Sequence, residues 1–470
     1  MTTRHLNQIS HHLSPFAPRK SAPKSSPRAG LTLIEIMIAL TMTLVVLGAM
    51  MQAFKYASAE MSKGRAVIEL SNQMRVAEEI LRRDLNNITV ELRLHTQTTI
   101  PLGYFEHVEG PRTDDADLNP TLLTTNKVLY GYLGDMDDIL AFTARDIDRG
   151  YRGRFYDVAT QNTSAIESNV AEIVWWTSFS DRNQNQSIEY DESVTVFRRV
   201  LLVLPELGTM RTDLTPNQVN YFFRRNDISA RVVPSATPGR FDVIANSLSD
   251  LAHRSSRFCH LPETQTAPAT DFPFELDRSL LLARRAMFDS TGDMIPNLPT
   301  EDDIILPDVA AFDVKFFCPD ALIEVSAGLA VEPDDVGFTG GDVNMPFGAF
   351  ADVGHKTGGG WFAGGPTPES QLEYQFIDAT LYPGLVDTVY DIWTPDYERD
   401  GRDQDGDGLI DEATNGIDDD GMGGVDDQGE RETQPPYLKP VRGIKVTFRM
   451  IEKRTKQVRQ SSIIHSFVPQ

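Results

Sequence analysis

The sequence is short of the residues that organise disulfide and zinc sites. Among 470 residues it has only two cysteines, Cys259 and Cys318, too few for a disulfide framework or a zinc ribbon. The sequence leaves open whether they form one disulfide bond or remain thiols. His253 and His260 lie near Cys259, but no second pair of ligands at zinc spacing accompanies them. We therefore expect a core or surface role for these histidines.

Catalytic motifs are also lacking. The chain contains no HExxH, GxSxG or Walker sequence, and no GxGxxG after a strand-like segment. Aspartate and glutamate are so numerous that no one pair can be singled out as a catalytic dyad. The sequence therefore predicts that the protein is not an enzyme.

Basic residues are scarce relative to acidic ones. The chain has 44 Lys and Arg against 68 Asp and Glu, a formal net charge of -24. Such a chain repels nucleic acid phosphates, so we expect no nucleic acid partner. With 40% hydrophobic residues and this length, it is able to bury a substantial core.

The amino-terminal residues have the opposite charge balance. Residues 1–30 carry five Lys or Arg and no acid. Residues 31–51 are apolar apart from threonines and Glu35, and as a helix of ~1.5 Å per residue they would be roughly 30 Å long, enough to cross a bilayer. The basic leader should stay in the cytoplasm, which places the rest of the chain on the outer face of the membrane.

Glu35 separates this segment from an ordinary anchor or secretory signal. A signal peptide has its small cleavage residue after the apolar run, whereas Gly30 precedes it here. A plain anchor accounts for the length and the flanking charge, but not for a carboxylate that costs about 2.5–3.5 kcal/mol inside an apolar span. We expect Glu35 to have a partner and a purpose.

The run RAG-LTLIE, from Arg28 to Glu35, resembles the class III signal of type IV prepilins and of the pseudopilins of type II secretion. The resemblance implies that a membrane peptidase cuts after Gly30 and methylates the new α-amine of Leu31. It also implies that Glu35, at the fifth mature position, pairs with the amine of a neighbouring subunit during filament assembly. The chain departs from the family in having Leu31 where Phe is usual, and in its long leader.

Helical periodicity continues past the apolar run. Residues 31–52 are expected to be a transmembrane helix and residues 53–95 its amphipathic continuation, because apolar residues recur three or four apart and no proline intervenes. The apolar face consists of Val67, Leu70, Met74, Ala77, Leu81, Leu85 and Ile88. The stretch Gln73 to Leu85 (QMRVAEEILRRDL) resembles J-type minor pseudopilins and the related W-type minor pilins.

Residues 96–470 are expected to form a β-rich domain, because β-branched and aromatic runs alternate with turn residues there. Residues 171–179 and 192–204 look like paired strands, 310–318 like a half-buried strand, and 441–451 with 458–468 like a hairpin. The Arg-Arg-Val strand, a late strand and a terminal hairpin again resemble the J-type pseudopilin, whose outer domain is antiparallel. The predicted fold is α+β: a long helix packed on an antiparallel sheet, with large loop insertions at 113–148, 226–300 and 327–433.

Acidic residues at alternate positions predict a calcium loop within the acidic segment 400–430. Hard cations need several oxygens, which alternate carboxylates on a tightly turned loop supply. The candidate ligands are Asp403, Asp405, Asp407, the carbonyl of Leu409, Asp411 and Glu412. Thr414 stands where an EF-hand has its bidentate glutamate, which favours an unpaired DxDxDG loop. A solvated acidic linker is the alternative.

Two further loops share parts of this pattern. Asp418, Asp420 and Asp426 align with the first loop, although Met422 replaces one ligand. In the polar loop near 181–192, the matching positions are Asp181, Asn183, Asn185, Glu189 and Glu192, with Gln186 where glycine is expected. A hairpin loop rich in Asn and Asp also forms without metal.

The resemblance as a whole implies a structural subunit. We expect a minor pseudopilin in the bacterial inner membrane, crossing once, with a periplasmic carboxy-terminal domain and a place in or at the tip of a pseudopilus. Its partners would be other pseudopilins, the prepilin peptidase and membrane lipid. The alternatives are a minor pilin of a type IV pilus and a membrane-tethered calcium-binding or hydrolytic ectodomain.

Overall fold

The computed structural model describes residues 30, 32–90, 103–108, 138–158, 160–179, 194–258, 260, 304–326, 328–332, 347–352, 389–391, 409–419, 421–426, 430, 441–452 and 457–467. The chain forms two compact units, Met1–Ser62 and Lys63–Gln470, which are described separately. Helix α1 (Leu33–Asn86) contributes to both.

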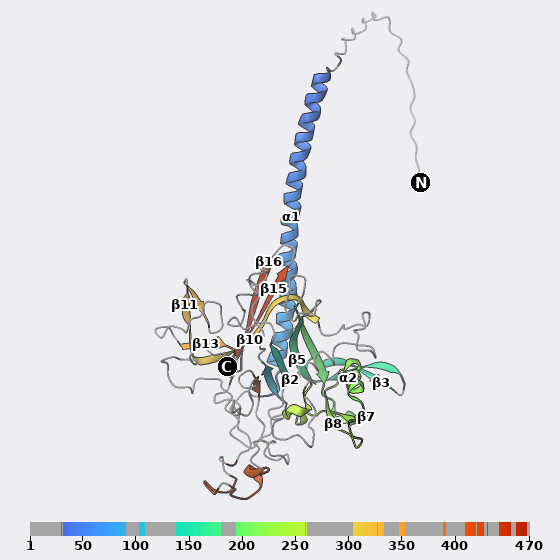
Figure 1. The fold of residues 1–470 in the computed structure, drawn as a ribbon, viewed down its shortest axis with the longest axis vertical. Coiled ribbons are helices and arrows are strands. Elements are labelled where there is room, and N and C mark those ends of the chain that lie inside the picture. Colours follow the sequence, from blue (N-terminus) through green and yellow to red (C-terminus); the bar gives the residue numbers. More distant parts are fainter. Residues whose placement is uncertain are drawn as a thin grey trace, which may run out of the picture. The chain divides into compact units, whose positions relative to one another are not determined.

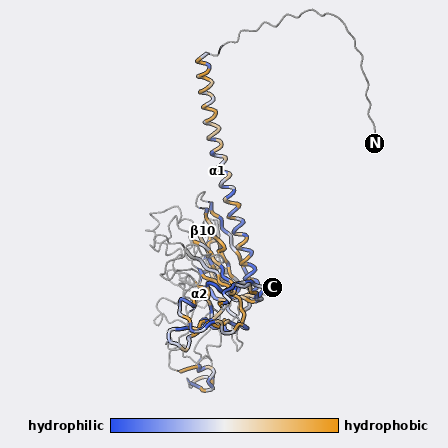
Figure 2. The backbone as a smooth tube through the Cα atoms, turned by 90° about the vertical axis from the view of Figure 1, so that its right-hand side faces the viewer, coloured by the Kyte–Doolittle hydropathy of each residue, from blue (hydrophilic) through white to orange (hydrophobic). Residues whose placement is uncertain are grey.

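In the first unit, α1 is apolar and its side chains are exposed. An 18-residue window has a mean hydropathy of 2.3 with none of it buried, so the helix is long and apolar enough to cross a membrane. Figure 2 shows this part of α1 mostly in the hydrophobic colours. The predicted membrane-spanning helix is thus confirmed as a candidate span, and its orientation stays a prediction.

In the second unit, one face of α1 is buried. The side chains of Leu70, Met74, Ala77, Leu81 and Leu85 are buried, and they all belong to the apolar face identified in the sequence. The helix ends at Asn86, before the expected residue 95. Asparagine and β-branched residues follow, which favour turns and strands over helix, and Ile88 forms a β-bridge with Ala144.

The second unit is built around a nine-stranded sheet with antiparallel pairing between its strands (Figure 1). Its order is β14-β1-β2-β5-β6-β10-β15-β16, and β13 also pairs with β10. The strands are β1 (Phe105–Val108), β2 (Ile139–Arg145), β5 (Val170–Phe179), β6 (Val194–Leu202), β10 (Ile304–Leu322), β13 (Phe347–Ala351), β14 (Val389–Asp391), β15 (Gly443–Glu452) and β16 (Gln457–Ser466).

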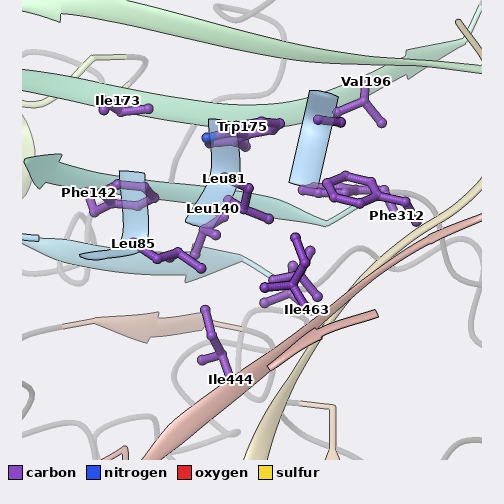
Figure 3. Close-up of a cluster of buried hydrophobic side chains, with 14 of the residues drawn as sticks. Leu81, Leu85, Leu140, Phe142, Ile173, Trp175, Val196, Phe312, Ile444 and Ile463 are labelled. Carbon is purple, nitrogen blue, oxygen red and sulfur yellow. The ribbon is translucent and has the colours of Figure 1, made fainter. Parts of the chain in front are cut away.

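The central strands are buried on both faces, because successive side chains enter different cores. In β5, Ile173 and Trp175 join the core that includes α1, whereas Val174 and Trp176 join a second core. Figure 3 shows the first core, with Leu81 of α1 near Leu140 and Trp175. This two-sided burial explains the nearly continuous apolar run of β5.

A smaller layer covers the second face. It contains the sheet β7-β9-β8, formed by Thr209–Leu214, Phe241–Ala245 and Ala230–Pro234, and helix α2 (Pro216–Arg225). Short 3-10 turns follow at η4 (Asp250–Ala252) and η5 (Arg254–Ser256), and η3 (Pro205–Leu207) precedes β7. Val219 and Phe223 of α2 pack with Trp176 in the second core.

Two hairpins lie outside these sheets. Strands β3 (Tyr151–Asp157) and β4 (Asn162–Ser168) form one, and β11 (Glu324–Ser326) with β12 (Leu329–Val331) forms the other.

The predicted α+β class with a mostly antiparallel sheet is confirmed. Strands β5 and β6 pair along their length, and β15 and β16 form the terminal hairpin. The expected insertions need correction, since 113–148 contains β2 and 327–433 contains β13 and β14, all in the main sheet. β2 was missed because a short, fully buried apolar strand has no alternation to mark it.

A buried ion pair fixes α1 on the sheet. The Asp84 side chain is fully buried, and Arg198 of β6 donates to both its oxygens at 2.6 and 2.8 Å. The Trp175 indole N–H donates to the same carboxylate at 3.1 Å. Asp84 lies in the last turn of α1, where the helix dipole disfavours an acid, so these donors are needed to stabilise it.

Arg199, the next residue of β6, joins the other layer to the opposite face of the sheet. Arg199 donates to the Phe223 carbonyl oxygen at 2.6 Å and to Asp227 at 3.0 Å, both at the end of α2. Because neighbouring residues of a strand point to opposite faces, the Arg198-Arg199 pair joins α1 and α2 to the same strand.

Breaking the first of these pairs should destabilise the fold. We expect Asp84→Asn to lower the free energy of unfolding by about 3 kcal/mol, because it leaves the Arg198 charge buried without its counter-charge. Urea unfolding of the full chain in detergent micelles, followed by tryptophan fluorescence, measures this. The control is Arg152→Gln, which removes an exposed pair with Glu167 and should stay within about 1 kcal/mol of wild type. Equal effects of the two changes would contradict the role of Asp84.

Candidate functional sites

The predicted processing site lies at the start of α1. Gly30 and Glu35 are exposed, and Leu31 lies outside the described residues. Thr32 and Glu35 form a capping box: the Thr32 backbone N–H donates to Glu35 Oε2 at 2.9 Å, and the Glu35 N–H donates to Thr32 Oγ1 at 3.3 Å. This reciprocal bonding satisfies two backbone donors at the helix start. Both partners follow Gly30 in the chain, so cleavage there leaves the box intact.

The acidic segment is described only in part. Asp403, Asp405 and Asp407 lie outside the described residues, as does Asp420. Leu409 is exposed, Asp411 is half-buried with a φ of 53°, and Glu412 is buried at the start of η9 (Glu412–Thr414). The first calcium loop therefore stays a prediction, because three of its candidate ligands lie outside the described residues.

The second loop uses its acids to hold its own backbone. The Gly416 N–H donates to Asp426 Oδ1 at 2.8 Å, and the Asp419 N–H donates to Glu430 Oε1. Asp418 is exposed. Among the described residues, no group of three or more His, Cys, Asp or Glu is placed to hold a metal ion. The candidate ligands Asp181, Asn183, Asn185 and Glu192 lie outside the described ranges.

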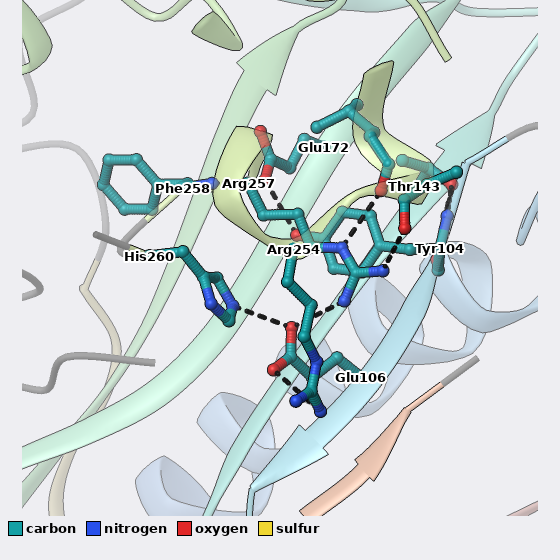
Figure 4. Close-up of polar contacts among 10 residues, drawn as sticks. Tyr104, Glu106, Thr143, Glu172, Arg254, Arg257, Phe258 and His260 are labelled. Carbon is teal, nitrogen blue, oxygen red and sulfur yellow. Dashed lines mark hydrogen bonds and ion pairs between the residues drawn. The ribbon is translucent and has the colours of Figure 1, made fainter. Parts of the chain in front are cut away.

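The structure also contains a buried polar network, centred on Glu106 of β1, that was not predicted from the sequence. Arg257 donates to Glu106 Oε2 at 3.1 Å, His260 Nε2 lies 3.0 Å from the same oxygen, and Arg254 lies 3.9 Å from Oε1. Figure 4 shows the three side chains converging on this carboxylate. Burial alone would raise the pKa of Glu106, but the hydrogen bond and charge of His260 and the charges of Arg254 and Arg257 hold it well below its usual value.

A second buried carboxylate, Glu172 of β5, completes the network. It accepts hydrogen bonds from the Tyr104 hydroxyl at 2.8 Å, the Ser229 hydroxyl at 2.6 Å and the Phe258 N–H at 2.8 Å. Burial nevertheless raises the pKa of Glu172, because these neutral donors and the charge of Arg257 do not offset the loss of water. Burial likewise raises the pKa of Tyr104.

Local geometry brings these groups together. Gly103 has a φ of +102°, and a Cβ there would lie 2.0 Å from Thr143 Oγ1, so only glycine allows the close approach of β1 and β2 that places Tyr104. The Arg257 guanidinium lies 4.2 Å from the Tyr104 ring centroid and donates to the carbonyl oxygens of Leu251 and Ala252. The network thus ties the 246–260 segment to the sheet.

We interpret this network as structural. Its members are buried, and they bind one another and the backbone of η4 and η5. The expectation of a core or surface role for His260 is consistent with its buried contact to Glu106. The signal in the sequence was Glu106 within FEHV and Glu172 within AEIVWW, since an acid inside an apolar strand requires a buried partner.

Ionisation of Glu106 and of Glu172 should change the free energy of unfolding in opposite directions as pH rises. The pKa of Glu106 is lower in the folded than in the unfolded chain, so its stabilising effect is present above about pH 4.3 and is lost as pH falls towards the folded pKa. The pKa of Glu172 is higher in the folded chain, so its ionisation lowers stability as pH rises from about 4.3 through the folded pKa.

We expect Glu106→Gln to cost about 3 kcal/mol of unfolding free energy at pH 7, because the buried guanidiniums of Arg254 and Arg257 lose their counter-charge. The cost should shrink below pH 4.3. Glu172→Gln should cost less, and its difference from wild type should shift in favour of the variant as pH rises. Urea unfolding between pH 3 and 8 measures both; parallel curves for wild type and both variants would refute the assignment.

Comparison with known proteins gives no further guide: no family model matches the chain, and no significant match was found among curated proteins or solved structures.

Proposed function

We propose that the chain is a minor pseudopilin of a type II secretion pseudopilus, of the J-type kind, made as a prepilin and processed after Gly30. The observation that carries the proposal is a single acidic side chain, Glu35, in the first turn of a helix whose following residues are exposed and apolar. Gly30 precedes that helix by three residues, and the basic residues 1–29 precede Gly30.

The second half of α1 supports the same proposal. A helix that is apolar and exposed in its first part, and packed on an antiparallel sheet in its second, is the arrangement expected of a pilin-like subunit. In this proposal residues 31–52 lie in the membrane, residues 53–86 form the amphipathic part, and the long connections between sheet strands are insertions.

A contact within the sheet domain links the two segments that resemble J-type pseudopilins. Asp84 belongs to QMRVAEEILRRDL, and Arg198 belongs to the Arg-Arg-Val strand. The structure joins their side chains in a bidentate pair. Motifs that lie 114 residues apart and meet in one buried contact support a shared architecture better than either motif alone.

The proposal has consequences for location and partners. The chain would cross the bacterial inner membrane once, with residues 1–30 cytoplasmic before cleavage and the sheet domain periplasmic. Its partners would be other pseudopilins and the prepilin peptidase, and its role would be structural, without catalysis. A minor pilin of a type IV pilus remains the closest alternative, since it shares every feature used here.

Mass spectrometry of the protein from its native membrane tests the processing step. The expected mature chain begins at Leu31 and carries one methyl group on its α-amine, and Gly30→Leu should leave the precursor uncut. A wild-type chain that begins at Met1, in cells with an active prepilin peptidase, would exclude the proposal and favour the tethered ectodomain.

Glu35 provides a separate test of assembly. We expect Glu35→Gln to reduce incorporation into filaments at least tenfold, because an amide cannot neutralise the amine of a neighbouring subunit within lipid. Cross-linking in membranes, with secretion as a second readout, measures incorporation. Glu79→Gln, at an exposed position of the same helix, is the matched control and should behave as wild type. A tethered ectodomain would tolerate both changes.

We also propose, on its sequence pattern, that the loop from Asp403 to Glu412 binds calcium. Titration calorimetry of the full chain in detergent micelles should detect uptake at millimolar calcium or below. The double change Asp405→Asn and Asp407→Asn should weaken uptake at least tenfold, because it removes two of the carboxylate charges that set the affinity of such a loop for calcium. The double change Asp181→Asn and Glu192→Gln tests separately whether the polar loop near residues 181–192 binds calcium. A wild-type chain without heat of calcium binding would end this proposal.

A further inference from the structure

Helix α2 ends in Arg225, whose guanidinium packs against two aromatic rings. The Arg225 guanidinium lies 4.2 Å from the ring centroid of Tyr156 in β3 and 4.6 Å from that of Tyr221, one turn earlier in α2. Within the described ranges it makes no hydrogen bond or ion pair. Attraction to the helix dipole accounts for a cation at this end, but not for two aromatic rings placed against it.

The two tyrosine rings hold the planar guanidinium of Arg225, with its N–H donors, in place near the surface. Stacking on aromatic rings uses the faces of a guanidinium and leaves its N–H edge available for a carboxylate. Tyr221 is 44% exposed, and Tyr156 and Arg225 are half-buried. Asp227, two residues further on, is bound by Arg154 and Arg199, so the local acid is already paired.

The chain itself carries a segment with complementary chemistry. Residues 403–430 contain eleven acidic residues and no Lys or Arg. In the described part, Asp418 and Asp426 are exposed beside the apolar side chains of Ile417, Met422 and Val425, which are 57%, 69% and 57% exposed. Carboxylates suit the guanidinium edge, and exposed apolar side chains suit the tyrosine rings.

We propose that the Tyr156–Arg225–Tyr221 cluster is a docking site for the acidic residues 409–419 and 421–426 of a second copy of the chain. In this contact, Arg225 donates two parallel N–H hydrogen bonds to one aspartate carboxylate, and the exposed apolar side chains of the acidic segment cover the two tyrosine rings. The two surfaces differ, so the contact is heterologous, and it builds a ring or an open chain according to whether the rotation between copies closes. This inference is independent of the proposed function, because it involves neither Gly30 nor Glu35.

Sedimentation velocity of the full chain in excess detergent micelles, with a chelator and low salt, tests the contact. Wild type should associate as its concentration rises, and association should weaken at high salt. Arg225→Ala should weaken it at least tenfold, and Arg225→Lys nearly as much, since lysine lacks the planar fork. Arg211→Ala, a half-buried arginine of β7, is the matched control and should not change it.

A mixing experiment separates this contact from the alternatives. The triple change Asp418→Asn, Asp419→Asn and Asp426→Asn removes the charges but keeps the amide oxygens that accept the loop's own hydrogen bonds. This variant and Arg225→Ala should each stay monomeric, whereas their equimolar mixture should form dimers and nothing larger, because it retains one intact contact. A monomeric wild type, which an intramolecular contact would give, or a monomeric mixture would overturn the proposal. Unchanged urea midpoints show that the variants fold.

Discussion

The position of α1 on the sheet depends on one buried charge. Leu81 and Leu85 supply apolar contact, but the hydrophobic effect is non-directional and by itself leaves the helix more freedom in its register. Asp84 removes that freedom, because any other register would leave a carboxylate in the core without Arg198 and Trp175. We infer that the ion pair contributes specificity for one register of α1 as well as stability, and that this register places Leu81 and Leu85 in the first core.

The adjacent arginines show how one strand organises both layers. Arg198 reaches the helix on one face, and Arg199 reaches the end of α2 on the other. Beyond them, the Glu106 and Glu172 network anchors the η4 and η5 segment to the same sheet. Buried charged groups therefore attach other elements to both faces of the sheet, which is why polar residues occur in otherwise apolar strands.

Much of the fold was predictable because its signals are local. The membrane-length helix, the paired strands β5 and β6 and the terminal hairpin follow from runs of apolar residues and from turn positions. Helix α2 was missed although its start is marked in the sequence. A capping box joins Thr215 to Gln218, and Pro216 occupies the first turn, which together are a recognisable start signal for a helix. Strand β2 and the Glu106 network were not predictable in the same way, because their partners are distant in sequence and neither composition nor periodicity records which acid meets which arginine.

The strand order has a consequence for how the chain acquires its structure. The last two strands, β15 and β16, contribute Phe448 and Ile463 to the same core as Leu81, near the beginning of the chain. The closure of this core therefore has a very high contact order, because Leu81 shares it with residues more than 350 positions later in the sequence. A chain cut before residue 441 lacks β15 and β16, which leaves β10 without its partner β15. Completion of the core around Leu81 therefore waits for the synthesis of β15 and β16.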